Sequence, residues 1–247
     1  MVMPQIEIAA EKIINLFGLP VTNTLLTSWM VTALLAVVAL FLKKGINIVP
    51  ARLQNIFEFF VEKFLGMMEG VFGTREKSEK YFPTVATIFI FILLSNWFGI
   101  LPGIGSVGFL EEHEGKELLI PLFRSAASDI NFTLALAVIA VFLVNTLGIT
   151  AVGFGKHISR FFSLKSPLDF FVGILEFISE IAKMISFSFR LFGNVFAGEV
   201  LLIITAFLIP YAVPVPFLML EIFVGFIQAL VFSMLTMVFI SIAVSHH

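Results

Sequence analysis

Two long apolar runs, residues 168–209 and 217–244, contain six ionisable side chains that cannot easily reach water: Glu176, Glu180, Lys183, Arg190, Glu199 and Glu221. Arg190 has aromatic and aliphatic neighbours on both sides in sequence: Phe187, Phe189, Leu191 and Phe192. An arginine does not release its proton in a protein, so it keeps a permanent charge in a poor solvent. A buried charge of this kind needs a polar or ionised partner, and charges inside apolar spans mark ion paths or binding sites. The pattern therefore indicates an ion path or an ion-binding site at Arg190.

Two polar residues share the helix face of Arg190. At 100° per residue, Ser186 and Asn194 lie about 40° to either side of it, whereas Glu199 lies about 180° away. Glu199 is therefore not expected to neutralise Arg190 within the helix. We expect Arg190 to be buried, with its counter-charge supplied by another subunit.

Prolines between the two runs predict a helical hairpin. Reversal at Pro210 places residues opposite one another when their numbers sum to about 420, which pairs Glu199 with Glu221 and brings Arg190 towards Gln228. Centring the turn on Pro214 would shift this register by about eight residues. In the first register two carboxylates share one membrane pocket and could share a proton. Gln228 follows Glu221 by two turns on the same face.

Several of these polar residues also have structural interpretations. Lys183 could extend its ammonium towards water from a helix end. Glu176, Glu180 and Lys183 have the spacing of a local ion-pair network. Asn96 and Asn131 are typical of hydrogen bonds between membrane helices.

The composition is that of a membrane protein. Hydrophobic residues make up 59% of the chain and charged residues 13%, against about 25% charged in soluble domains. The formal net charge of −2 and the lack of a basic stripe argue against a nucleic-acid partner. The absence of cysteine excludes disulfides and thiol chemistry. The first 20 residues contain Glu7, Glu11 and Lys12 and are expected to be a mature segment rather than a targeting peptide.

We predict an all-α polytopic protein with a single membrane domain, 1–247, and about five membrane helices. An external N-terminal segment, 1–24, precedes spans at 25–42, 83–102 and 131–155, and a polar connector, 74–80, precedes the second of these spans. Residues 51–72 alternate apolar and acidic positions at helical spacing, which favours an amphipathic helix at the membrane interface. The runs 168–209 and 217–244 form the hairpin.

The first arm of the hairpin is too long to stand upright in a bilayer. Its 42 residues between Pro167 and Pro210 would extend about 60 Å as one helix, twice the hydrocarbon thickness of about 30 Å. We expect a steep tilt, a bend at Gly193 or Gly198, or projection beyond the membrane.

The distribution of basic residues predicts the orientation. Segments 43–82 and 155–167 hold ten Lys/Arg: Lys43, Lys44, Arg52, Lys63, Arg75, Lys77, Lys80, Lys156, Arg160 and Lys165. The N-terminus and the acidic 103–130 loop hold three: Lys12, Lys116 and Arg124. Basic loops remain in the cytoplasm, so we predict the N-terminus outside and the C-terminal His246-His247 inside.

The run around Arg190 resembles a known signature. The segment from Ser186 to Glu199, Ser-Phe-Ser-Phe-Arg-Leu-Phe-Gly-Asn-Val-Phe-Ala-Gly-Glu, is similar to the signature of subunit a of F-type ATP synthases. Gly-Phe-Ile-Gln-Ala-Leu-Val-Phe, beginning at Gly225, resembles the motif of the family's last helix. The resemblance extends over roughly residues 25–245.

The resemblance implies a role for each matching residue. Arg190 would face the carboxylate of a rotating c-ring and separate two half-channels. The half-channel open to the outside would contain Asn194, Glu199, Glu221 and Gln228, with Asp129 at its mouth. The cytoplasmic half-channel would contain Glu176, Glu180, Lys183 and Ser186. Many family members have a histidine and a carboxylate where this chain has Glu199 and Glu221, so two glutamates suggest a different way of sharing the proton.

The implied function is a proton-conducting stator subunit of a bacterial plasma-membrane ATP synthase, with the c-ring, the subunit b stalk and the lipid bilayer as partners. The chain would perform no bond chemistry and need no cofactor or metal, since it has no phosphate-binding Gly-rich motif. A secondary ion-coupled transporter with a midplane charged site is the alternative, but it predicts an internal repeat, and none is visible. A third interpretation is a non-conducting scaffold of a respiratory complex.

Overall fold

The computed structural model describes residues 9–16, 18–45, 52–101, 107–113, 116–159, 161, 166–210 and 213–245. Five helices are long and apolar enough to cross a membrane: α1 (Asn23–Gly45), α3 (Arg75–Ile100), α4 (Ile130–Val152), α6 (Pro167–Leu208) and α7 (Pro214–Ser245). Two more helices, α2 (Arg52–Phe72) and α5 (Phe154–Ser159), connect them. The predicted all-α polytopic fold, with its final long hairpin, is confirmed.

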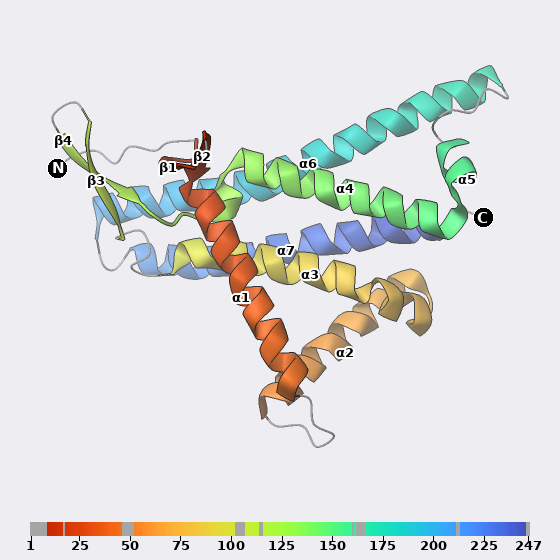
Figure 1. The fold of residues 1–247 in the computed structure, drawn as a ribbon, viewed down its shortest axis with the longest axis horizontal. Coiled ribbons are helices and arrows are strands. Elements are labelled where there is room, and N and C mark those ends of the chain that lie inside the picture. The colour runs from red at the N-terminus through yellow and green to blue at the C-terminus, as the bar shows by residue number, and fades with distance from the viewer. Residues whose placement is uncertain are drawn as a thin grey trace.

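Four helices form a bundle along the long axis of the molecule. In Figure 1, α3, α4, α6 and α7 run along this axis, whereas α1 and α2 diverge from it. Helix α7 packs against α3, α4 and α6, and α4 packs against α6. The fully buried side chains include Phe64, Ile92, Leu191, Met237 and Ile240. Many other large apolar side chains are exposed, which suits helices surrounded by lipid.

Helix α2 has the predicted amphipathic pattern. Phe64 and Met68 are buried against the bundle, whereas Glu58 and Glu62 are exposed. Apolar side chains at its edge, including Ile56 and Phe59, are also exposed. This combination of an apolar face and acidic positions suits the boundary between lipid and headgroups, and the interfacial location remains a prediction.

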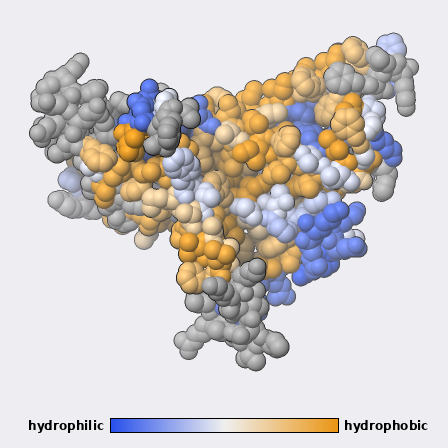
Figure 2. Space-filling view, in the orientation of Figure 1, coloured by the Kyte–Doolittle hydropathy of each residue, from blue (hydrophilic) through white to orange (hydrophobic). Residues whose placement is uncertain are grey.

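Helix α3 begins earlier than the sequence predicted. The segment 74–80 was expected to be a connector, but the helix starts at Arg75 and includes Pro83. The first turns are held by ion pairs from Arg75 to Glu69 and Glu79, each 2.8 Å, and i,i+4 pairs of this kind support helices. Figure 2 shows hydrophilic residues gathered at this α2–α3 corner, beside the largely apolar surface of the bundle.

Two small β-hairpins were not predicted. Strand β1 (Lys12–Leu16) pairs antiparallel with β2 (Leu19–Thr22), and β3 (Gly108–His113) pairs with β4 (Lys116–Pro121). Part of the acidic 103–130 loop is therefore a hairpin, followed by the 3-10 helix η2 (Ala126–Ser128). Gly18 adopts φ +85° before β2, a conformation that glycine reaches without strain. The four strands have only four to six residues each, so these isolated hairpins leave little periodic signal in the sequence.

The hairpin arms are single helices. Ser166 caps α6 by accepting a hydrogen bond from the Leu168 amide (3.2 Å), and Pro167 occupies the first turn, where its missing N–H has no cost. The 42 residues of α6 form one continuous helix of about 63 Å. In α7, the Phe232 ring packs against Phe187 of α6 in a tilted arrangement, with ring centroids 4.7 Å apart. Glu221 lies against Gly198, so these contacts agree with the register centred on Pro210.

Some predictions concern residues outside those described. These are the end of the second span at Pro102, the side chains of Lys43 and Lys44, Glu114 in the acidic loop, Arg160, Lys165 and the C-terminal histidines His246 and His247. The orientation in the membrane remains a prediction.

Candidate functional site

Arg190 lies on the surface of the chain. Its guanidinium donates to Ser186 Oγ (3.3 Å), and the Asn194 amide donates to the Arg190 carbonyl (2.9 Å). The predicted polar stripe is therefore present on α6. The prediction that Arg190 is buried is wrong, because its side chain is exposed. Residues adjacent in sequence lie on different sides of a helix. Here Phe187 and Leu191 pack into the bundle, whereas Phe189 and Arg190 are exposed.

The Arg190 guanidinium has no carboxylate partner in the described part of the chain. Within the described residues, neither Gln228 nor Glu199 hydrogen-bonds to it. It lines an open groove of about 250 Å³ between α6 and α7, together with Ser179, Ala182, Lys183, Ser186, Phe187, Leu235 and Phe239. The permanent charge of Arg190 is therefore without an ion pair in the part of the chain that the structure describes.

Glu199 forms an ion pair that the sequence did not reveal. Arg124, in the segment between β4 and η2, places Nε 2.8 Å from Oε1 and 3.1 Å from Oε2 of Glu199. The Arg124 side chain is 10% exposed and the Glu199 side chain is 25% exposed. Sequence reasoning counted Arg124 only as a loop charge. The pair spans 75 residues, so no local spacing could have identified it.

Glu221 has a different environment from Glu199. It is 8% exposed, and its Oε2 has no hydrogen-bond partner among the described residues. A Cβ at Gly198 would lie 2.8 Å from Oε1 of Glu221, so a larger residue there would require this carboxyl group to move. The two glutamates lie near one another, as the register centred on Pro210 predicted, because the Glu221 carboxyl group lies against Gly198, the residue before Glu199. A pocket of about 200 Å³ is lined by Asn194, Ala197, Gly198, Leu201, Phe217, Leu220, Glu221 and Val224.

A polar network lies at the other end of the hairpin. Lys183 Nζ donates to Glu180 Oε1 (2.6 Å), and the Asn145 amide donates to Glu180 Oε2 (3.4 Å). Asn145 Oδ1 lies 3.0 Å from His157 Nε2. Glu180 and His157 are buried, 8% and 6% exposed. The network joins α6, α4 and α5.

The position of Lys183 decides between its two interpretations. Its ammonium lies 4.6 Å from the centroid of the Phe239 ring on α7 and is held by Glu180, so it does not extend away from the bundle. The local ion pair predicted between Glu180 and Lys183 is present. Asn145 and His157 were missed, and a polar Asn in an apolar span followed by a lone histidine was the signal available.

Asp129 and the asparagines have structural contacts. Asp129 caps α4 by accepting a hydrogen bond from the backbone N–H of Asn131 (2.9 Å). It also accepts from the Thr24 hydroxyl on α1 (3.0 Å). Asn96 donates to the Gly225 carbonyl (3.0 Å), which links α3 to α7 as expected for hydrogen bonds between helices. Asn131 instead donates locally to Asp129 (3.1 Å).

The remaining predicted residues lie on the same two helices. Glu176 is half-buried on α6, one turn before Glu180, and Gln228 is half-buried on α7, two turns after Glu221. The site residues therefore fall into three places along the hairpin: around Glu199 and Glu221, at Arg190, and around Glu180.

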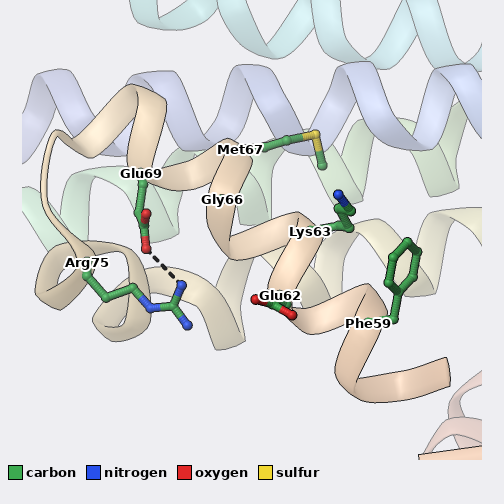
Figure 3. A pocket seen from close by; sticks show the side chains of 7 residues that line it. All are labelled: Phe59, Glu62, Lys63, Gly66, Met67, Glu69 and Arg75. Carbon is green, nitrogen blue, oxygen red and sulfur yellow. Dashed lines mark hydrogen bonds and ion pairs between the residues drawn. The ribbon is translucent and has the colours of Figure 1, made fainter. Parts of the chain in front are cut away.

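A third groove lies away from the hairpin residues. Figure 3 shows it on α2, with a volume of about 630 Å³ and a lining of Phe59, Glu62, Lys63, Gly66, Met67, Glu69 and Arg75. The Glu69–Arg75 pair in it is exposed, and exposed pairs contribute about 0–1 kcal/mol to stability. In the described part of the chain no cluster of three acidic or histidine side chains could hold a metal.

The fold and site define a multi-pass helical membrane protein with charged and polar side chains placed along one long apolar hairpin. The family model described as ATP synthase A chain matches residues 25–241. The chain is 31% identical to ATP synthase subunit a of Moorella thermoacetica, over 96% of this chain and 97% of that protein. It is 33% identical to ATP synthase subunit a of Campylobacter jejuni, over 86% of this chain and 85% of that protein. It is also 33% identical to ATP synthase subunit a of Helicobacter pylori, over 87% of this chain and 86% of that protein. The chain belongs to the ATP synthase subunit a family.

Proposed function

We propose that this chain is the proton-conducting stator subunit of an F-type ATP synthase in a bacterial plasma membrane. The observation that carries the proposal is Arg190, an exposed permanent cation in the middle of an apolar hairpin, without an ion-pair partner in the described residues. A charge in this position requires a counter-charge. The carboxylate of a c-ring subunit, passing along the outside of α6, would supply it.

The polar residues to either side of Arg190 would form two offset half-channels. Asn194, Glu199, Glu221 and Gln228 would form the path open to the outside, with Asp129 near its mouth. Ser186, Lys183, Glu180 and Glu176 would form the cytoplasmic path. Glu199 and Glu180 lie nine and ten residues from Arg190, about 14 and 15 Å along the helix, so neither path needs to pass through Arg190.

The fixed charge at Arg190 would couple proton flow to rotation. It attracts the ionised ring carboxylate and repels a proton moving directly from one half-channel to the other. Each proton that instead travels on the ring gains about 2.3 kcal/mol per 100 mV of membrane potential. The chain's own residues move protons and bind no nucleotide, and the rest of the synthase, including the subunit b stalk, would perform the chemistry and hold this chain still.

The test is proton pumping driven by ATP in inverted membrane vesicles containing the whole synthase. Arg190→Ala should reduce pumping to background, because the ring carboxylate then meets no cation. Arg75→Ala is the matched control: it removes an exposed arginine at the α2–α3 corner and should leave pumping near the wild-type level. Retained pumping by Arg190→Ala, with the subunit present in normal amount, would overturn the proposal. Proton transport by the purified chain alone would favour the transporter alternative.

A further inference from the structure

The two glutamates at the turn of the hairpin have unlike surroundings. Both Glu199 oxygens lie within hydrogen-bond distance of Arg124 Nε. Glu221 is packed against Gly198, and its Oε2 has no partner among the described residues. The sequence presents two equivalent carboxyl groups, whereas the fold surrounds them differently.

Arg124 approaches Glu199 from outside the hairpin. It belongs to the segment between β4 and η2, and its Nη1 lies 3.4 Å from the carbonyl oxygen of Ala9 near β1. The segment that carries it is anchored nearby, because Ser125 and Ser128 are buried and the Ser125 hydroxyl donates to the Ser95 carbonyl of α3 (3.3 Å). The guanidinium is therefore held in place by the outer loops while its Nε contacts a helix of the proton path.

We propose that Arg124 is a positioning residue that holds Glu199 as a fixed anion, and that Glu221 alone carries the proton through this part of the path. The inference rests on the proposed function. It assigns the two glutamates separate roles and gives the loop between β4 and η2 a part in conduction.

The contacts favour this division of roles. Protonation of Glu199 would weaken a close, charge-assisted ion pair with an arginine that remains charged. A proton on Oε2 of Glu221 would break no existing hydrogen bond. The fixed negative charge of Glu199 also acts on Glu221 from the neighbouring helix. A proton that arrives here therefore binds at Glu221, beside the pocket that Asn194 lines.

The ion pair makes a specific prediction for paired substitutions. Arg124→Gln leaves the charge of Glu199 without its partner in a mostly buried position, and pumping should fall about tenfold. Arg124→Lys keeps the charge but loses the planar guanidinium that contains Nε. Its pumping should therefore lie between that of the wild type and that of Arg124→Gln. The double variant Arg124→Gln with Glu199→Gln contains neither charge and should pump several-fold faster than Arg124→Gln alone.

The experiment measures ATP-driven proton pumping by the whole synthase in inverted vesicles, normalised to the amount of assembled complex. Recovery in the double variant and partial rescue by Arg124→Lys support the inference, and a purely structural loss would show neither. Wild-type pumping by Arg124→Gln, or a double variant no better than Arg124→Gln, would overturn it. Arg190→Ala in the same membranes keeps the two proposals distinct: pumping by that variant contradicts the proposed function, whereas its loss leaves the Arg124 series to test this inference alone.

Discussion

The two ends of the α6–α7 hairpin each contain a buried carboxyl group, and the two groups differ in their hydrogen bonds. Near the turn, Glu221 has an oxygen with no hydrogen-bond partner in the described residues and lies beside a small pocket. At the other end, Glu180 accepts from Lys183 and Asn145, one donor on each oxygen. A fully hydrogen-bonded carboxylate is held in one charge state, whereas an unpartnered one is free to bind a proton. Under the proposed function, the turn end would bind the transported proton at Glu221, and Glu180 would hold a fixed charge beside the cytoplasmic path.

The largest effect should follow from removing the unpartnered carboxyl group. Glu221→Gln keeps the size of the side chain but cannot carry a proton, so ATP-driven pumping should fall about a hundredfold or more. Glu180→Gln should cost less, about tenfold, because its role is to hold Lys183. Glu62→Gln, an exposed position on α2, is the control and should be neutral. Equal losses at Glu221 and Glu180 would remove the distinction between the two ends.

A smaller effect should follow from displacing Glu221 without changing it. A Cβ at Gly198 would lie 2.8 Å from Oε1 of Glu221, so Gly198→Ala forces the carboxyl group out of its position. Pumping should fall about tenfold, since misplacement of a reacting group by about 1 Å has losses of this order or larger. Gly70→Ala on α2 is the control, because a Cβ there meets no atom within 4 Å. Unchanged pumping in Gly198→Ala would show that the Glu221 position is not critical.

The smallest effect should follow from loosening the network at the other end. Asn145→Leu removes the hydrogen bonds to Glu180 and His157 and leaves a buried carboxyl oxygen without a donor, which costs about 1–3 kcal/mol. Because Lys183 still holds Glu180, pumping should fall only about two- to fivefold. Thr146→Ala, on the same helix, removes a hydroxyl that donates to the Phe142 carbonyl one turn earlier in α4, and it should have no effect. A loss in Asn145→Leu as large as that in Glu221→Gln would contradict the ranking.

The sequence predicted the parts of this account that depend on composition and periodicity. Apolar runs of spanning length predicted the membrane helices, and proline at the turn predicted a hairpin register that the Phe187–Phe232 contact supports. The polar stripe of Ser186, Arg190 and Asn194 followed from helical spacing alone. These features are local, so the chain determines them without reference to its other segments.

The features that the sequence did not predict depend on contacts between distant segments. The Arg124–Glu199 pair joins a loop to a helix 75 residues away, and the His157–Asn145 contact depends on how α5 folds back on α4. Apolar neighbours suggested that Arg190 is buried, because a sequence cannot distinguish the interior of a bundle from a surface that faces lipid or another subunit. The two β-hairpins are too short to give a clear pattern.

The proposed function requires Arg190 to face a carboxylate of a ring subunit. The chain contains no cysteine, so Ser186→Cys places a single thiol on the exposed stripe one turn from Arg190. Oxidation of the assembled synthase should cross-link this thiol to a cysteine placed beside the ring carboxylate, whereas Thr146→Cys, exposed on α4, should not react. Cross-linking from residue 186 with none from residue 146 is the predicted result. A ring that cross-links to residue 146, or to neither position in an intact complex, would contradict the account.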